Sequence, residues 1–298
     1  MGVAAALLYL LFAQRPLVPT IRLESIQSIT PENSTKAVGS VKGTQVDGKG
    51  ASLEERGLYE KAGRSFSIRP DQQGVAEVDR SGRSLWSREF GSPITAASVS
   101  SSISAWGLLD GSIQVLDGEG RRLWELKPSA EGLDSAYPCI YSLAISAGGE
   151  SIAALYGLSP QYFLVFERAG GSYSLSYGRK LEKQVRNAQA SSFSMDGSCV
   201  IGRTGDGLAF YDVRRGKGEL VHAERFSGEA ELRIEPFGDC GFAVLLAKGG
   251  ERFAGLVRYG TLAAMFPVAA DSSDISIEEN SLLVEGGGIV HSYKVAEP

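Results

Sequence analysis

Residues that commonly carry out chemistry are scarce in this chain and lack the spacings that chemistry requires. The 298 residues include 2 His and 3 Cys. The sequence contains no G-x-S-x-G turn, phosphate-binding glycine loop, H-E-x-x-H motif or Cys-x-x-Cys pair. His222 and His291 lie in apolar, strand-like stretches, so we expect structural or surface roles for them. The sequence therefore predicts no catalytic residue, no cofactor and no metal site.

Three further groups of polar residues have a structural interpretation. The cysteines are odd in number and far apart, which is typical of buried core residues: Cys139, Cys199 and Cys240. Asp-Gly pairs occur at 110–111, 196–197 and 206–207. No alternating series of calcium ligands accompanies them, and Asp-Gly supplies the positive φ angles of tight hairpins, so we interpret them as turns. The basic group Arg214, Arg215 and Lys217 indicates a solvated turn, with phosphate binding as the alternative.

The composition excludes one class of partner and indicates one class of fold. A formal net charge of −5 argues against nucleic-acid binding, because a phosphate backbone requires a basic surface. Glycine contributes 37 of the 298 residues, without a collagen-like period. Such an excess indicates many tight turns between short strands. The length allows one large domain or two small ones.

One segment of eight residues recurs with little change. Residues 79–86 read DRSGRSLW and residues 117–124 read DGEGRRLW, so both fit D-x-x-G-R-x-L-W. The two copies begin 38 residues apart. Five fixed positions in eight indicate a repeated unit of supersecondary structure rather than a chance match.

The repeated unit consists of short strands separated by glycine turns. Residues 192–212 (SFSMDGSCVIGRTGDGLAFYD) contain three strands and two Asp-Gly turns, and residues 106–117 repeat the second half. Weaker copies cover 142–168, 233–259 and 274–295. Few helices are expected, because no stretch after residue 20 keeps a 3.6-residue apolar period. Four strands in about 40–45 residues make one blade of a β-propeller.

These segments resemble two kinds of propeller repeat. SFSMDGSCVIGRTGDGLAFYD resembles a WD-repeat blade, although the WD dipeptide is absent, and D-x-x-G-x-x-L-W resembles the tryptophan-docking motif of quinoprotein-type propellers. The resemblance covers roughly residues 36–296. It implies an all-β fold, a single β-propeller of six or seven four-stranded blades. It carries over no ligand residues, so quinone-dependent catalysis is not expected.

The repeats predict where the blades lie and which residues join them. We expect blades at 36–90, 92–129, 138–182, 188–226, 229–268 and 271–296. The last shows three strands, and residues 20–29 could supply a fourth that closes the ring by pairing the two ends of the chain. The long first block also allows seven blades. Trp86 and Trp124, with Gly82 and Gly120 in their turns, are predicted to dock neighbouring blades, with both tryptophans buried.

The first residues form an apolar segment that precedes the strands. Residues 2–13 carry no charged side chain, and Arg15 and Pro16 end the run. This length is short for a membrane-spanning helix but typical of the apolar region of a secretory signal. A buried N-terminal helix or strand is the alternative. We expect a signal or membrane anchor at 1–19 and an extracytoplasmic propeller domain at 20–298, in the periplasm if the source is bacterial.

One group of loop residues could contact a partner. In a propeller, the loop that enters a blade and the loop between its second and third strands emerge on the same face. For the blade at 138–182 these are residues 130–138 and 157–161, both longer than their counterparts. The candidate partner-binding residues in or beside them are Tyr137, Pro160, Tyr156 and Tyr162. Tyr137 and Pro160 are predicted to be the best exposed. The alternative is that the tyrosine rings pack into the core of the blade.

These features favour a non-enzymatic β-propeller that serves as a protein-interaction scaffold, tethered to a membrane or exported. We expect a monomeric propeller with one or more protein partners, no nucleic-acid partner, and contact with a membrane through its N-terminal segment alone. Two alternatives stay open. One is an envelope assembly factor, by analogy with periplasmic propellers that share the docking motif; the other is an enzyme with its site at the mouth of the central channel.

Overall fold

The computed structural model describes most of the chain from residue 57 onward. The described residues are 57–185, 191–205, 207–221, 226, 231–278, 281–286 and 289–294. The apolar segment at 1–19, the ring-closing strand expected at 20–29 and residues 36–56 of the first expected blade lie outside them. Asp206 and His222 also lie outside the described residues.

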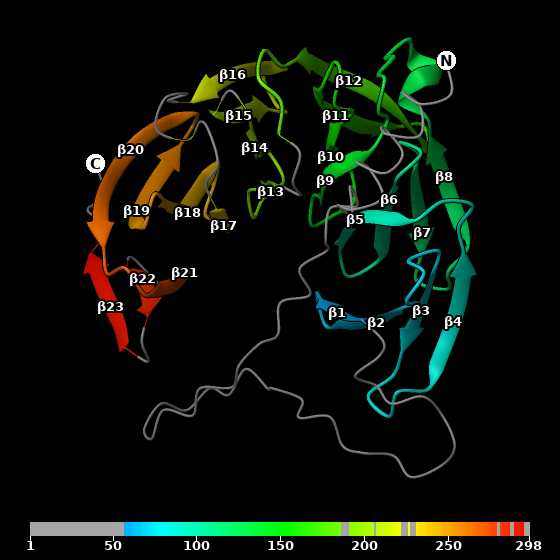
Figure 1. Ribbon diagram of the computed structural model, residues 1–298, viewed down its shortest axis with the longest axis horizontal. Coiled ribbons are helices and arrows are strands. Elements are labelled where there is room, and N and C mark those ends of the chain that lie inside the picture. The colour runs from blue at the N-terminus through cyan, green and yellow to red at the C-terminus, as the bar shows by residue number, and fades with distance from the viewer. Residues whose placement is uncertain are drawn as a thin grey trace, which may run out of the picture.

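The described strands form six antiparallel sheets, each built from strands that follow one another in the sequence (Figure 1). The first sheet contains β1 (Gly57–Lys61), β2 (Arg64–Ile68), β3 (Gly74–Val78) and β4 (Ser84–Glu89). The second contains β5 (Ile94–Val99), β6 (Ile103–Leu108), β7 (Ile113–Asp117) and β8 (Arg122–Leu126). A 3₁₀ turn at Pro128–Glu131 leads to the third sheet. That sheet contains β9 (Ile140–Ile145), β10 (Ser151–Tyr156), β11 (Tyr162–Ala169) and β12 (Ser172–Lys180).

The second half of the chain continues the same pattern. The fourth sheet contains β13 (Ser191–Phe193), β14 (Cys199–Thr204), β15 (Gly207–Asp212) and β16 (Lys217–Val221). The fifth contains β17 (Glu231–Phe237), β18 (Gly241–Lys248), β19 (Glu251–Arg258) and β20 (Thr261–Val268). The sixth contains β21 (Ser272–Glu278), β22 (Ser281–Gly286) and β23 (Ile289–Lys294). Each sheet falls within one expected blade, and the sixth has three strands in the described residues, as predicted.

The sheets stand side by side around a centre, with their first strands innermost. Figure 1 shows them as an arc that runs from the first sheet to the sixth. Neighbouring first strands pack together, including β5 with β9, β9 with β13 and β17 with β21. The second strands β6, β10 and β14 are buried at every position, because a neighbouring sheet covers each face. In the outermost strands β4 and β12, exposed residues instead alternate with partly or fully buried ones.

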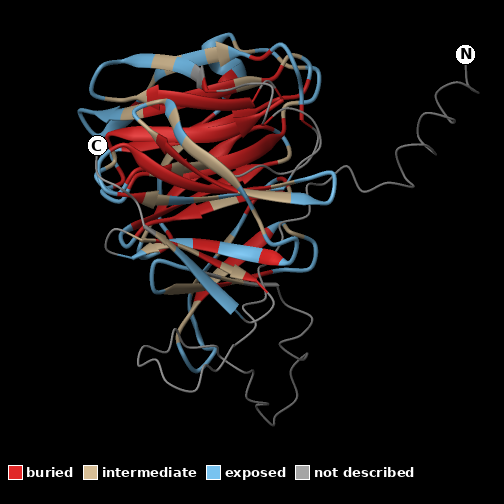
Figure 2. Ribbon diagram, turned by 90° about the vertical axis from the view of Figure 1, so that its left-hand side faces the viewer, coloured by how far each residue is buried: buried red, intermediate tan, exposed pale blue. Residues whose placement is uncertain are grey.

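The hydrophobic core is divided into five layers, one between each pair of neighbouring sheets. Phe66 and Trp106 belong to the layer between the first and second sheets. Ile113 and Phe166 belong to the next layer, and the three later interfaces have layers of their own. Figure 2 shows the buried residues concentrated in the inner strands, with exposed residues in the turns at the edges. Each sheet is therefore held by its neighbours rather than by one central core.

The repeated D-x-x-G-R segment forms the turn before the fourth strand of a sheet. Asp117 Oδ1 accepts hydrogen bonds from the backbone N–H groups of Glu119 and Arg121, and Asp117 Oδ2 accepts one from Arg121 Nε at 2.8 Å. Asp79 makes the same set of bonds, with Arg83 Nε at 3.1 Å. The aspartate therefore caps the turn, and the arginine four residues later pairs with it.

Trp86 joins the first sheet to the second. Its indole Nε1 donates hydrogen bonds to Glu77 Oε2 at 2.7 Å and to the carbonyl oxygen of Gly118 at 3.1 Å. Its ring lies against Gly120, where an added Cβ would be 2.5 Å from a ring carbon. Since Gly120 also has a φ of +76°, this turn requires glycine on two counts.

The second repeat makes a similar contact with the third sheet. The Trp124 ring lies 5.7 Å from that of Phe166 and 4.7 Å from that of Tyr173, between ring centroids. The expected burial of the two motif tryptophans was wrong, because Trp86 and Trp124 are both half-buried at the edges of their sheets.

Gly82 differs from its counterpart in the second repeat. It has a φ of +78°, but an added Cβ would meet no described atom within 4 Å. Gly82 therefore shapes its turn, and no described residue lies against its Cα as Trp86 lies against that of Gly120.

A disulfide connects the fourth sheet to the fifth. Cys199 at the start of β14 and Cys240 just before β18 are bonded, with their Cα atoms 5.1 Å apart. All three cysteines are buried, as expected, but the sequence did not indicate that Cys199 and Cys240 are bonded; Cys139 is a free thiol. The two bonded cysteines are 41 residues apart, about one repeat, so they occupy equivalent positions on adjacent sheets.

Candidate functional site

The candidate partner loops lie at the junction of the second and third sheets. Antiparallel pairing brings the connection between the second and third strands of a sheet to the same end as the connection to the next sheet. For these sheets the connections at that end are residues 109–112, 127–139, 157–161 and 181–185. We call them together the loop face.

Hydrogen bonds tie the two candidate loops to each other. Ser135 Oγ accepts hydrogen bonds from the backbone N–H groups of Leu158 and Ser159, at 3.0 and 3.1 Å. The Ala136 N–H donates to the carbonyl oxygen of Ser159 at 2.8 Å. Gly157, with a φ of +74°, allows this approach, because an added Cβ would lie 2.6 Å from Ser135 Oγ. The loops therefore share one face, as predicted, and hold each other in place.

Gln161 fixes the far side of the same loop. Its side chain is fully buried, and its Nε2 donates hydrogen bonds to the carbonyl oxygens of Gly157 and Val185, both at 2.9 Å. Its Oε1 accepts a hydrogen bond from the Val185 N–H at 3.0 Å. This amide connects the loop to the segment that leaves the third sheet. Sequence reasoning missed it, because the partner residue is 24 positions away.

The four predicted partner residues differ in their exposure to solvent. Tyr137 is 50% exposed, and Pro160 and Tyr162 are half-buried. Tyr156 is 1% exposed, and its ring stacks on that of Tyr162 with centroids 6.3 Å apart. The prediction that Tyr156 offers its ring to a partner was therefore wrong. For this tyrosine the alternative interpretation, packing into the blade, is correct.

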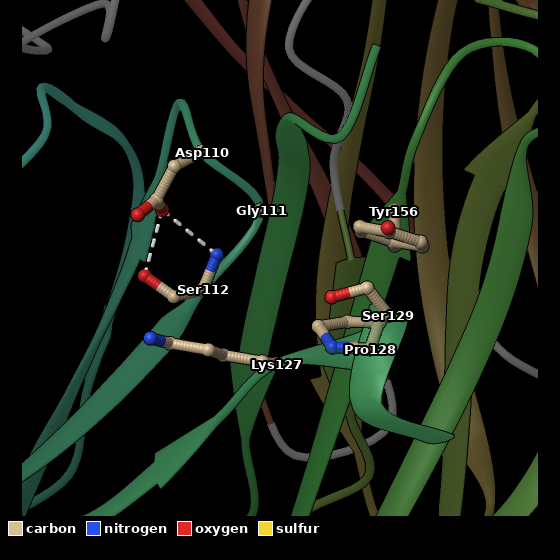
Figure 3. Close-up of a pocket in the computed structure, with 7 residues that line it drawn as sticks. All are labelled: Asp110, Gly111, Ser112, Lys127, Pro128, Ser129 and Tyr156. Carbon is tan, nitrogen blue, oxygen red and sulfur yellow. Dashed lines mark hydrogen bonds between the residues drawn. The ribbon is translucent and has the colours of Figure 1, made fainter. Parts of the chain in front are cut away.

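Tyr156 nevertheless lines a small polar pocket on the loop face. The pocket has a volume of about 110 Å³. Figure 3 shows the residues that line it: Asp110, Gly111, Ser112, Lys127, Pro128, Ser129 and Tyr156. A second, more open hollow of about 500 Å³ lies on the same face. It is lined by Ser159, Pro160, Lys180, Leu181, Glu182 and Gln184.

The other polar groups singled out in the sequence serve turns. Arg214 pairs with Asp196 at 2.5 Å, and Arg215 with Asp212 at 3.5 Å, so the basic group forms a solvated turn with carboxylate partners. Burial raises the pKa of Asp196, but hydrogen bonds from neighbouring serines and the charge of Arg214 outweigh it and lower that pKa to about 2. His291 is exposed on β23.

The closest grouping of potential metal ligands coincides with the disulfide. Among the described residues, ligand atoms of Cys199, Asp212 and Cys240 lie within 4.8 Å of one another. Both sulfur atoms are bonded to each other, and the backbone N–H of Arg215 donates to Asp212 Oδ1 at 3.1 Å. We assign no metal to this cluster. In the described part of the chain, no helix has the length and apolar character to cross a membrane.

Comparisons with known proteins agree with the architecture. A family model described as "beta-propeller protein" matches residues 49–227, more than half of the chain. The structure is similar to that of the computationally designed Ika8 protein, with a TM-score of 0.56 and 16% identity over 80% of this chain and 70% of that one. It is also similar to BamB from Moraxella catarrhalis, with a TM-score of 0.51 and 13% identity over 79% of this chain and 67% of that one. No curated protein matched the sequence.

Proposed function

This chain belongs to the β-propeller protein family, and on that premise we propose that it is a non-enzymatic, monomeric scaffold that binds a protein partner through its loop face. The observation that carries the proposal is the position of Tyr137. Its half-exposed ring follows Ser135 and Ala136, the two residues that hold their loop against the neighbouring one. A large ring on a preorganised loop can bury apolar area at little cost in conformational entropy, which is the property of an interface hot spot.

We further propose that the scaffold works outside the cytoplasm, with residues 1–19 as its export signal or membrane anchor. The disulfide between Cys199 and Cys240 supports this location, because such bonds persist in oxidising compartments and are rare in the cytosol. An envelope assembly factor would be one form of this scaffold. The likeness to BamB, at 13% identity, is a likeness of fold.

The proposal is tested by removing the Tyr137 ring. We expect Tyr137→Ala to weaken capture of partner proteins by about tenfold or more, measured by crosslinking in native membranes and quantitative mass spectrometry. Tyr259→Ala is the matched control. Tyr259 is 59% exposed but lies in the turn between β19 and β20, at the opposite end of its sheet. Equal capture by both variants and the unchanged protein would overturn the proposal.

A further inference from the structure

The polar pocket beside Tyr156 has fixed walls. Gly111 has a φ of +83°. A Cβ added to it would collide with the Pro138 carbonyl oxygen and the Tyr156 ring, so only glycine fits at this position. Asp110 Oδ1 accepts hydrogen bonds from both the backbone N–H and the hydroxyl of Ser112, at 3.0 and 2.7 Å. The turn between β6 and β7 is therefore ordered before any ligand arrives, which reduces the entropy cost of binding.

One hydroxyl in this pocket is free to bind a ligand. Tyr156 is 1% exposed as a residue and lines the pocket, where its hydroxyl has no hydrogen-bond partner among the described residues and stays within reach of solvent. Burial raises the pKa of Tyr156, and the nearby carboxylate of Asp134 raises it further, so the hydroxyl stays protonated at neutral pH. A ligand in the pocket can supply a hydrogen-bond partner for this hydroxyl.

The pocket also contains a positive and a negative group. Lys127 lies on its wall, and its only ion pair among the described residues is with Glu125 at 3.6 Å, so the ammonium has donors to spare. Asp110 uses one carboxylate oxygen for Ser112 and keeps the other as an acceptor. A ligand that enters therefore meets an ammonium donor and a carboxylate acceptor around one small volume (Figure 3).

These charges select a neutral group with both a donor and an acceptor. A carboxylate ligand would pair with Lys127 but also meet the charge of Asp110, an ammonium would pair with Asp110 but also meet that of Lys127, and an apolar group would offer the Tyr156 hydroxyl no hydrogen bond. A carboxamide has an acceptor oxygen, two N–H donors and no net charge. Its few heavy atoms suit a volume of about 110 Å³.

We propose that this pocket binds the carboxamide of an asparagine or glutamine side chain presented by the protein partner. Its oxygen accepts hydrogen bonds from Lys127 and Tyr156, and its amino group donates to Asp110. The inference rests on the proposed scaffold function, because the pocket opens on the same loop face as Tyr137 and so lies where the partner would dock.

The test uses amino acids capped at both ends, which share their backbone amides and differ in the side chain alone. Capped glutamine, asparagine, glutamate and methionine are titrated into the full chain, and the amide NMR shifts of Gly111 and Ser129 are followed. We expect glutamine or asparagine to bind about fivefold or more tightly than glutamate and methionine, the difference that one hydrogen bond makes. Tyr156→Phe, which removes the hydroxyl and keeps the ring, should abolish that preference.

Two exposed lysines provide a test variant that should leave the fold intact and a matched control variant. Lys127→Met should lower the affinity for the carboxamide about fivefold, whereas Lys180→Met, which changes a lysine of the second hollow, should not. Equal binding of all four probes, tighter binding of glutamate, or no effect of Tyr156→Phe and Lys127→Met would overturn the inference. Because no partner protein is present, these outcomes are independent of the Tyr137→Ala capture experiment that tests the scaffold function.

Discussion

At the scale of single residues, a buried carboxylate organises the contact between the first two sheets. Glu77 accepts hydrogen bonds from Arg64 through both of its oxygens, at 2.9 and 2.7 Å, and a third from the Trp86 indole. The same indole N–H also reaches the carbonyl oxygen of Gly118 in the second sheet. The ion pair thus orients the tryptophan, and the tryptophan joins the sheets.

This network makes the stability of the fold depend on pH. The hydrogen bond from Arg64 lowers the pKa of Glu77, and its charge and the Trp86 bond lower it further against the opposing effect of burial. A lowered pKa in the folded state means that the stabilisation is present above the ordinary glutamate pKa and is lost as the pH falls through the folded value. We expect Glu77→Gln to be less stable at pH 7 and to lose less stability on acidification. Urea unfolding at pH 7 and pH 3 measures both, and parallel losses in the two proteins would contradict the prediction.

The two repeat glycines provide a matched pair of substitutions. Gly82→Ala and Gly120→Ala both place a side chain at a φ near +77°, which costs about 1–2 kcal/mol. Gly120→Ala also drives a methyl group into the Trp86 ring, which we expect to add about 1–3 kcal/mol. Chemical denaturation of the two variants gives the difference directly. Equal free energies of unfolding would show that Trp86 does not press on Gly120.

Some residue roles could be predicted from the sequence and others could not. The D-x-x-G-R turn was recognisable because its hydrogen bonds join residues within four positions of one another. The burial of Tyr156 was not, because a tyrosine at the end of a strand fits a loop surface or a core equally well. What decides it is the close approach of Gly111, which belongs to the second sheet's turn and not to its own sheet.

At the scale of elements, short-range turn chemistry accounts for the accuracy of the expected blades. In the second to fifth sheets the connection between the second and third strands contains glycine, so the limits of these sheets follow from local signals. Two connections between elements had no such signal. The Gln161 amide and the Cys199–Cys240 bond depend on segments brought together by the stacking of sheets.

The disulfide gives a test at this scale. It closes a loop of 41 residues across two sheets, for which the chain-entropy model gives about 4 kcal/mol of stabilisation. Urea unfolding of the oxidised protein and of Cys199→Ser/Cys240→Ser should show that loss. Thiol titration of the denatured protein should find one free thiol without reductant and three with it. Burial raises the pKa of Cys139 to about 11, so the native protein should not react at all. Three thiols without reductant would contradict the bond.

At the scale of the whole molecule, the sheets depend on their neighbours. Each core layer belongs to one interface, so an inner sheet is stabilised from two sides. The sixth sheet differs, because its outermost described strand, β23, exposes two adjacent apolar residues, Ile289 at 60% and Val290 at 57%. An edge strand with unpaired backbone groups and apolar side chains is a site for one more strand.

We propose that residues 20–29 supply that strand and close the ring, as the alternating Ile21 and Leu23 of that segment suggest.

Two truncations separate this role from that of the apolar segment before it. Deleting residues 1–19 should leave the free energy of unfolding unchanged, because a signal or anchor adds nothing to the core of the propeller. Deleting residues 1–29 should lower it by about 2 kcal/mol or more, since it re-exposes the apolar side chains of the added strand and of β23. Hydrogen exchange supplies the second measurement: the amides of β23 should lose protection in the longer deletion alone. If both deletions unfold at the same urea concentration, the ring is closed by some other contact, and residues 20–29 belong with the apolar segment at 1–19 rather than with the propeller.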